Sequence, residues 1–188
     1  MGIRQPPCHG TATVREPPRR PARYSTPMSD LLGYFITFRT YGTWLHGDMR
    51  GSTDYCHNTY GTPRLAPDPR LVESTRKRMH GPPYVMGVRE RAIVHAAIEE
   101  TCRFRDWHIW ALKVRTNHVH IVLSAPGSTA ERVMNDLKIY ATRALRRASL
   151  IQTQTQVWSR HGSTPHLFES DQLAAAIQYV TLLQDSHN

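Results

Sequence analysis

Cysteine is scarce in this chain, and long apolar runs are missing from it. The three cysteines, Cys8, Cys56 and Cys102, are odd in number and far apart, so they form no CxxC pair and no disulfide framework. This usage fits a reducing compartment. No apolar run approaches the roughly 18 residues that span a bilayer, and the N-terminus carries no apolar signal-peptide core. We therefore expect a cytoplasmic protein with no membrane partner.

Glycine-rich phosphate loops, dinucleotide glycine motifs and internal repeats are also missing, which argues against the common nucleotide-binding folds. Acidic residues are in the minority, with 15 Asp and Glu against 24 Lys and Arg. The resulting net charge of +9 and the pI near 9.9 favour a polyanionic partner, with nucleic acid first. The alternative is an arginine-rich proteome in which the charge has no specific function.

The first 27 residues differ from the rest of the chain. They hold six of the thirteen prolines and five arginines against one glutamate, with no apolar periodicity. Such a segment cannot bury enough apolar surface to offset the entropy lost on ordering. We predict that 1–27 is a disordered tail, and that Met28 resembles a natural start, which would make the tail an extension of the gene model. The folded domain is then 28–188.

The remaining chain predicts alternating strands and helices. A short helix is expected around 70–81 within the irregular connection 42–87. Ser128 with Glu131 has the spacing of a capping box, and Ser170 or Asp171 is the expected cap of the last helix. The expected elements are a strand at 33–42, a helix at 87–106, strands at 107–115 and 117–124, a helix at 127–150, a candidate strand within 158–168 and a helix at 170–184. This order predicts an α+β fold with a ferredoxin-like antiparallel sheet and helices packed on one face.

The segment "NHVHIVL" places two histidines on one face of a strand. Residues i and i+2 of a strand share a face, so His118 and His120 point one way while Val119, Ile121 and Leu123 form an apolar face. The pair could hold a divalent metal and leave coordination positions open, as Lewis-acid catalysis requires. It could also be two ordinary residues.

A tyrosine, Tyr140, lies in the helix that follows, on or beside its apolar face. Alone it is best explained as a core residue. Next to a metal-activated phosphodiester it could instead attack phosphorus and form a phosphotyrosine bond. Four basic residues of this helix could form a solvated face or contact phosphates: Lys138, Arg143, Arg146 and Arg147. Trp44 and Trp158, in polar loops, could fill the core or stack on unpaired bases.

These motifs together resemble a known family. "NHVHIVL" followed by "LKIYATRAL" is similar to the HUH endonucleases, and the segments "FITFRTYGTWLHGD" and "WSRHGSTPHLF" resemble the REP-associated tyrosine transposases. The resemblance implies that His118 and His120 bind Mg²⁺ or Mn²⁺ and that Tyr140 is the nucleophile that forms a 5′-phosphotyrosine intermediate. It implies single-stranded or hairpin DNA as partner, in particular palindromic repeats, and allows a homodimer.

Some members of that family place a third metal ligand, a glutamine, one helical turn after the tyrosine. Here Ala144 occupies that position and cannot bind metal. Asp136, His161 and His46 are the alternatives.

Three other functions fit parts of the sequence. A DNA-binding protein that has lost catalysis would explain Ala144. A replication or conjugation initiator nuclease would share the chemistry, although the chain is small and has no helicase segment. An RNA-binding ferredoxin-like module would explain the charge but not the combination of two histidines with a tyrosine.

Overall fold

The computed structural model describes residues 30–45, 47–49 and 66–182 of the chain. All of them except Asp30 belong to one structural unit, Leu31–Asn188. The predicted disordered tail, 1–27, lies outside the described residues, so that prediction stands as it was made.

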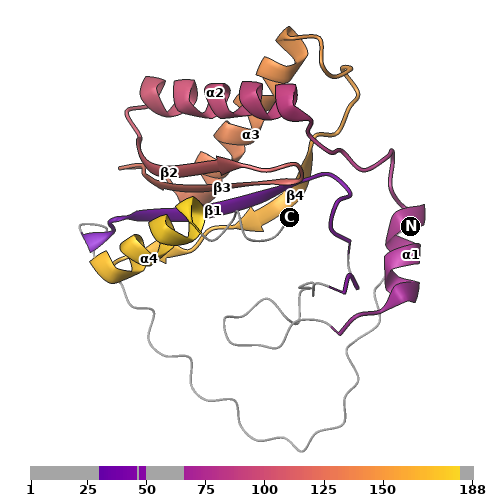
Figure 1. The fold of residues 1–188 in the computed structure, drawn as a ribbon, viewed down its shortest axis with the longest axis horizontal. Coiled ribbons are helices and arrows are strands. Elements are labelled where there is room, and N and C mark those ends of the chain that lie inside the picture. Colours follow the sequence, from indigo (N-terminus) through magenta and orange to yellow (C-terminus); the bar gives the residue numbers. More distant parts are fainter. Residues whose placement is uncertain (1–29, 46, 50–65, 183–188) are drawn as a thin grey trace, which may run out of the picture. The chain divides into compact units, whose positions relative to one another are not determined.

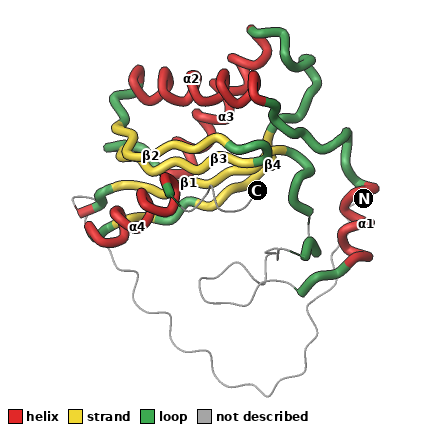
Figure 2. The backbone as a smooth tube through the Cα atoms, in the orientation of Figure 1, coloured by secondary structure: helices red, strands yellow, loops and turns green. Residues whose placement is uncertain are grey.

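The centre of the unit is an antiparallel sheet whose four main strands run side by side in the order β2-β3-β1-β4 (Figure 2). A short fifth strand also pairs with β1. The strands are β1 (Gly33–Thr40), β2 (His108–Val114), β3 (His118–Ser124), β4 (Trp158–Ser163) and β5 (His166–Leu167). Helices α1 (Pro69–Lys77) and α2 (Val88–Phe104) follow β1, and α3 (Ala130–Arg147) follows β3. Apart from α1, the short strand β5 and the last helix, this order is the β-α-β-β-α-β succession of a ferredoxin-like fold. The predicted α+β class is confirmed.

Two helices, α2 (Val88–Phe104) and α3 (Ala130–Arg147), pack on one face of the sheet, as predicted (Figure 1). They bury one set of alternating strand residues. Because side chains alternate along a strand, this face of β3 carries only apolar side chains. The strand residues in this core are Tyr34, Ile36 and Phe38 of β1 and Val119, Ile121 and Leu123 of β3.

The last helix, α4 (Ser170–Thr181), lies on the opposite face (Figure 1). Its Ala176 and Val180 pack against Ala111 of β2 and Val122 of β3 in a second, smaller core. The prediction of helices on one face therefore holds for α2 and α3 but not for α4. The physical reason is that the second face of the sheet is also partly apolar and needs its own cover.

Strand β2 contains an irregularity that the sequence pattern did not predict. Regular alternation would place Ile109, Ala111 and Lys113 on one face. The register with β3 shifts between Ile109 and Ala111, as at a β-bulge. Ile109 consequently packs toward the α2/α3 core, whereas Ala111 and Lys113 face the side of α4.

Neither of the two predicted helix caps is the cap that the structure has. The N-cap of α3 is Thr129, whose hydroxyl accepts a hydrogen bond from the Arg132 amide at 3.3 Å, and not Ser128. The Ser128 amide instead donates to the Ala125 carbonyl, so Ser128 belongs to the preceding turn. The N-cap of α4 is Glu169, and no side-chain hydrogen bond caps that helix.

Candidate active site

The two histidines of β3 lie side by side on the sheet face that α4 partly covers. Their ring centroids are 4.6 Å apart, with the ring planes at 72°. His118 Nδ1 is 2.6 Å from Oδ1 of Asn117, and His120 Nδ1 is 2.7 Å from Oγ1 of Thr37. When Nδ1 of an imidazole is held by a neighbour, Nε2 becomes the metal-binding nitrogen. The two rings therefore have the supporting hydrogen bonds of a metal-binding pair.

Burial and nearby positive charge favour the neutral form of His120. Burial has the largest effect, and together with the neighbouring His118, Arg39 and Arg115 it lowers the pKa of His120 to about 3. A neutral imidazole is the form that coordinates a metal ion.

No third His, Cys, Asp or Glu side chain joins this pair in the part of the chain that the structure describes, because no group of three such residues occurs there. Asp136 forms a 3.0 Å ion pair with Arg105 of the segment after α2, on the other side of the sheet. Ala144 lies on α3, and His161 is exposed on β4. His46 lies outside the described residues. Two histidines alone leave most coordination positions to water or substrate, which fits a weak and open site.

Tyr140 does not meet the histidines within the chain. It belongs to α3, whose buried residues face Val119 and Ile121, whereas His118 and His120 point to the opposite face of the same strand. The sheet separates them, and the Tyr140 ring lies 5.4 Å from the guanidinium of Arg143. The predicted convergence of these three side chains is therefore wrong for a single chain.

A different tyrosine, Tyr179 of α4, contacts His120 of the pair. Its ring centroid is 5.7 Å from that of His120 at an interplanar angle of 83°, and 5.8 Å from that of Phe35. Ala176 and Val180 hold this side of the helix on the sheet. The Tyr179 side chain is nevertheless 40% exposed, so a large substrate could reach it.

The sequence motifs did not point to Tyr179. A signal was available, because Tyr179 is a large aromatic residue at the border of the apolar stripe of α4. The other outward positions of this helix are small or polar, among them Ala174, Ala175 and Gln178.

Lys138 is not a phosphate contact in this structure. Its side chain is buried, and Nζ donates to the carbonyls of Ser159, Arg160 and His161 at 3.0, 3.4 and 3.3 Å. Burial lowers the pKa of Lys138 to about 8. The predicted nucleic-acid role is wrong for this residue, because all three ammonium protons are used to hold the irregular start of β4.

The three predicted arginines of α3 are exposed. Arg143 lies against Tyr140, and Arg146 donates to the Thr153 carbonyl at 2.7 Å. Together with Arg147 they remain candidates for DNA contact, but α3 and the histidine pair lie on opposite sides of the sheet.

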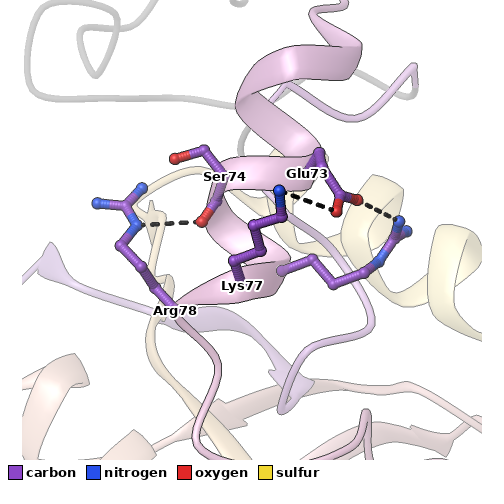
Figure 3. Close-up of polar contacts among 5 residues, drawn as sticks. Glu73, Ser74, Lys77 and Arg78 are labelled. Carbon is purple, nitrogen blue, oxygen red and sulfur yellow. Dashed lines mark hydrogen bonds and ion pairs between the residues drawn. The ribbon is translucent and has the colours of Figure 1, made fainter.

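A second basic element is α1 (Pro69–Lys77), which Asp68 caps through its side chain. Glu73 forms ion pairs with Arg76 at 3.2 Å and Lys77 at 3.8 Å, and Arg78 Nε donates to the Ser74 carbonyl (Figure 3). Exposed pairs of this kind contribute about 0–1 kcal/mol each. One glutamate among these cations leaves the helix positively charged at its C-terminal end.

The chain matches a family model over residues 84–180, which is more than half of its length, and the model describes IS200-like transposases. This protein therefore belongs to the IS200-like transposase family. None of the helices in the described ranges is long and apolar enough to cross a membrane.

Solved structures with a related arrangement include a REP-associated tyrosine transposase bound to a REP hairpin. The two share 13% sequence identity with a TM-score of 0.46, over 83% of this chain and 68% of the other. No curated protein sequence matches this chain significantly.

Proposed function

We propose that this transposase cleaves and rejoins single-stranded DNA, with Tyr179 as the nucleophile and the histidine pair as the metal site. The observation that carries the proposal is the contact between the Tyr179 and His120 rings. A nucleophile and a metal that act on one phosphate must lie within one phosphate group of each other. Within one chain, Tyr179 lies close enough to the histidine pair to meet this requirement, whereas Tyr140 does not.

His118 and His120 would hold Mg²⁺ or Mn²⁺ through their Nε2 atoms, and Asn117 and Thr37 would orient the two rings. When bound, the cation would withdraw charge from the scissile phosphate and make it susceptible to attack. That help matters because a phenol with a pKa near 10 is a poor nucleophile on an unactivated diester.

The Tyr179 oxygen would attack phosphorus, forming a tyrosine O–P bond as the bond from phosphorus to the 3′ oxygen breaks. The phenol loses its proton, and the leaving 3′ oxygen takes one up. The products are a 5′-phosphotyrosine and a free 3′-hydroxyl. The ester bond is retained, so the reverse attack by a 3′-hydroxyl rejoins strands without ATP. Palindromic repeats that fold into hairpins remain the proposed DNA partner. A homodimer remains the proposed assembly of the protein.

Two variants with the same chemical change test the nucleophile. Tyr179→Phe and Tyr140→Phe each remove one hydroxyl and keep the ring. With Mn²⁺ and a labelled single-stranded repeat oligonucleotide, Tyr140→Phe should form the covalent protein–DNA adduct like the wild type, whereas Tyr179→Phe should form none. The reverse pattern would return the role to Tyr140, acting across a dimer.

One alternative has specific support. A DNA-binding protein without catalysis would need no third metal ligand, and no third His, Cys, Asp or Glu joins the histidine pair among the described residues. It predicts that the wild type binds the oligonucleotide in a salt-sensitive manner but forms no adduct with any divalent cation.

A further inference from the structure

The histidine face carries cations on both neighbouring strands, at the positions that pair with the two histidines. Arg39 of β1 pairs with His118, and Lys113 of β2 pairs with His120. Directly opposed residues of antiparallel strands point to the same face. Arg39 and Lys113 therefore lie on either side of the histidines, and both are half-buried.

Arg39 has a fixed orientation. Its guanidinium carbon lies 3.1 Å from the centroid of the Trp44 ring, as in a stacked cation–π pair. Trp44 follows a turn that is itself anchored, because the Thr43 hydroxyl donates to the Thr40 carbonyl at 3.0 Å and the Tyr41 amide donates to the Val157 carbonyl at 2.9 Å. Stacking of this kind fixes the plane of the guanidinium, whose fork matches the geometry of a phosphate.

We propose that Arg39, stacked on Trp44, and Lys113 form a phosphate clamp that binds the DNA phosphodiester at the histidine pair. The clamp rests on the proposed function for the identity of its ligand. Positively charged side chains on both sides of the histidines favour an anionic ligand at the pair. A phosphodiester offers two anionic oxygens, which suit the fork of Arg39 on one side and the point charge of Lys113 on the other. Trp44 is a positioning residue, because it acts through Arg39.

The clamp can be tested by binding alone, in the Tyr179→Phe background where no adduct forms. The probe is a labelled single-stranded oligothymidine, and the affinity is measured over a range of salt concentrations. Each lost phosphate contact should reduce the log–log slope by about 0.7. Arg39→Gln and Lys113→Gln should each show this reduction. Arg103→Gln, an exposed cation on α2 across the sheet, should not. Slopes for Arg39→Gln and Lys113→Gln equal to that of Arg103→Gln would overturn the clamp.

Three further variants separate charge from geometry in the active protein. Arg39→Lys retains the slope but should slow adduct formation at least tenfold, because the fork is lost. Trp44→Leu should do the same, and Trp44→Phe should restore the rate. Arg39→Lys also serves as the test if Arg39→Gln loses its cooperative unfolding transition. Adduct formation at the wild-type rate in both Arg39→Lys and Trp44→Leu would overturn the positioning role.

Failure of the clamp and failure of the proposed function are distinguishable. If the wild type forms no adduct but the slope falls in Arg39→Gln and Lys113→Gln, the phosphate site stands and strand transfer does not. If the wild type forms the adduct and the slopes are unchanged, strand transfer stands and the clamp is wrong.

Discussion

The hydroxyl of Thr37 and Nδ1 of His120 lie 2.7 Å apart, across the neighbouring strands β1 and β3. This hydrogen bond fixes the ring plane of the more buried of the two histidines. Since hydrogen bonds behind a metal ligand orient it, Thr37 would have an indirect role in the proposed metal binding.

Thr37→Val keeps the branched shape and removes the hydroxyl. We expect the affinity for Mn²⁺, measured by calorimetry, to fall about 10–100-fold, the usual effect of losing such a partner. Thr142→Val is the matched control, because its hydroxyl bonds the Lys138 carbonyl on α3, away from the histidines. Both variants should lose about 0.5–1.5 kcal/mol of stability. Equal Mn²⁺ affinity in the two variants would contradict the metal site.

Replacing Arg143, Arg146 and Arg147 together by glutamine should leave adduct formation unchanged. These side chains lie on the α3 side of the sheet, and the proposed chemistry takes place on the other side. Gel analysis of the adduct and the salt dependence of binding measure the effect. A slope that falls by about 0.7 for each residue replaced would show that DNA also binds along α3.

Lys138→Met should destabilise the fold, because three backbone carbonyls of β4 would lose their donor. The expected cost is about 1–3 kcal/mol at neutral pH. Urea unfolding with a probe of β4, such as Trp158 fluorescence, would measure it. An unfolding free energy equal to that of the wild type would mean that water replaces the lysine.

The same residue predicts a pH dependence. The pKa of Lys138 is about 8 in the folded state against 10.5 for a free lysine. The folded protein thus binds fewer protons between these values, so the stability of the wild type relative to Lys138→Met should rise as the pH increases from 8 to 10.5. Below pH 8 the difference should be constant. If the stability of the wild type relative to Lys138→Met fell over this interval, the three carbonyls that Lys138 contacts would instead raise its pKa.

The order of elements and the shared face of the histidines could be predicted because both depend on local patterns. Alternation along "HVHIVL" separates His118 and His120 from Val119 and Ile121, and the structure has this arrangement. The same alternation argues against Tyr140 as the nucleophile beside these histidines. A helix that packs on Val119 and Ile121 cannot also reach the histidines, because a strand has two faces.

Other parts of the site depend on long-range structure. Helix α4 covers the second face of the sheet because that face has its own apolar patch around Val122. The sequence near Tyr179 does not show which face of the sheet the helix will cover. Lys113 lies beside His120 only because β2 shifts its register after Ile109. Nothing in the sequence near Lys138 distinguishes a buried lysine bound to carbonyls from an exposed lysine bound to phosphate.

Strand β3 has seven residues, and its two faces have different roles. Mutations on one face should therefore have a different effect from mutations on the other. Substitutions at Val119 or Ile121 open the α2/α3 core and lower the amount of folded protein. Substitutions at His118 or His120, which lie outside that core, should leave it intact and, if the proposed function holds, lower DNA processing. A mutational scan that records protein abundance alongside DNA processing should therefore alternate between the two phenotypes from one residue to the next along this part of the strand.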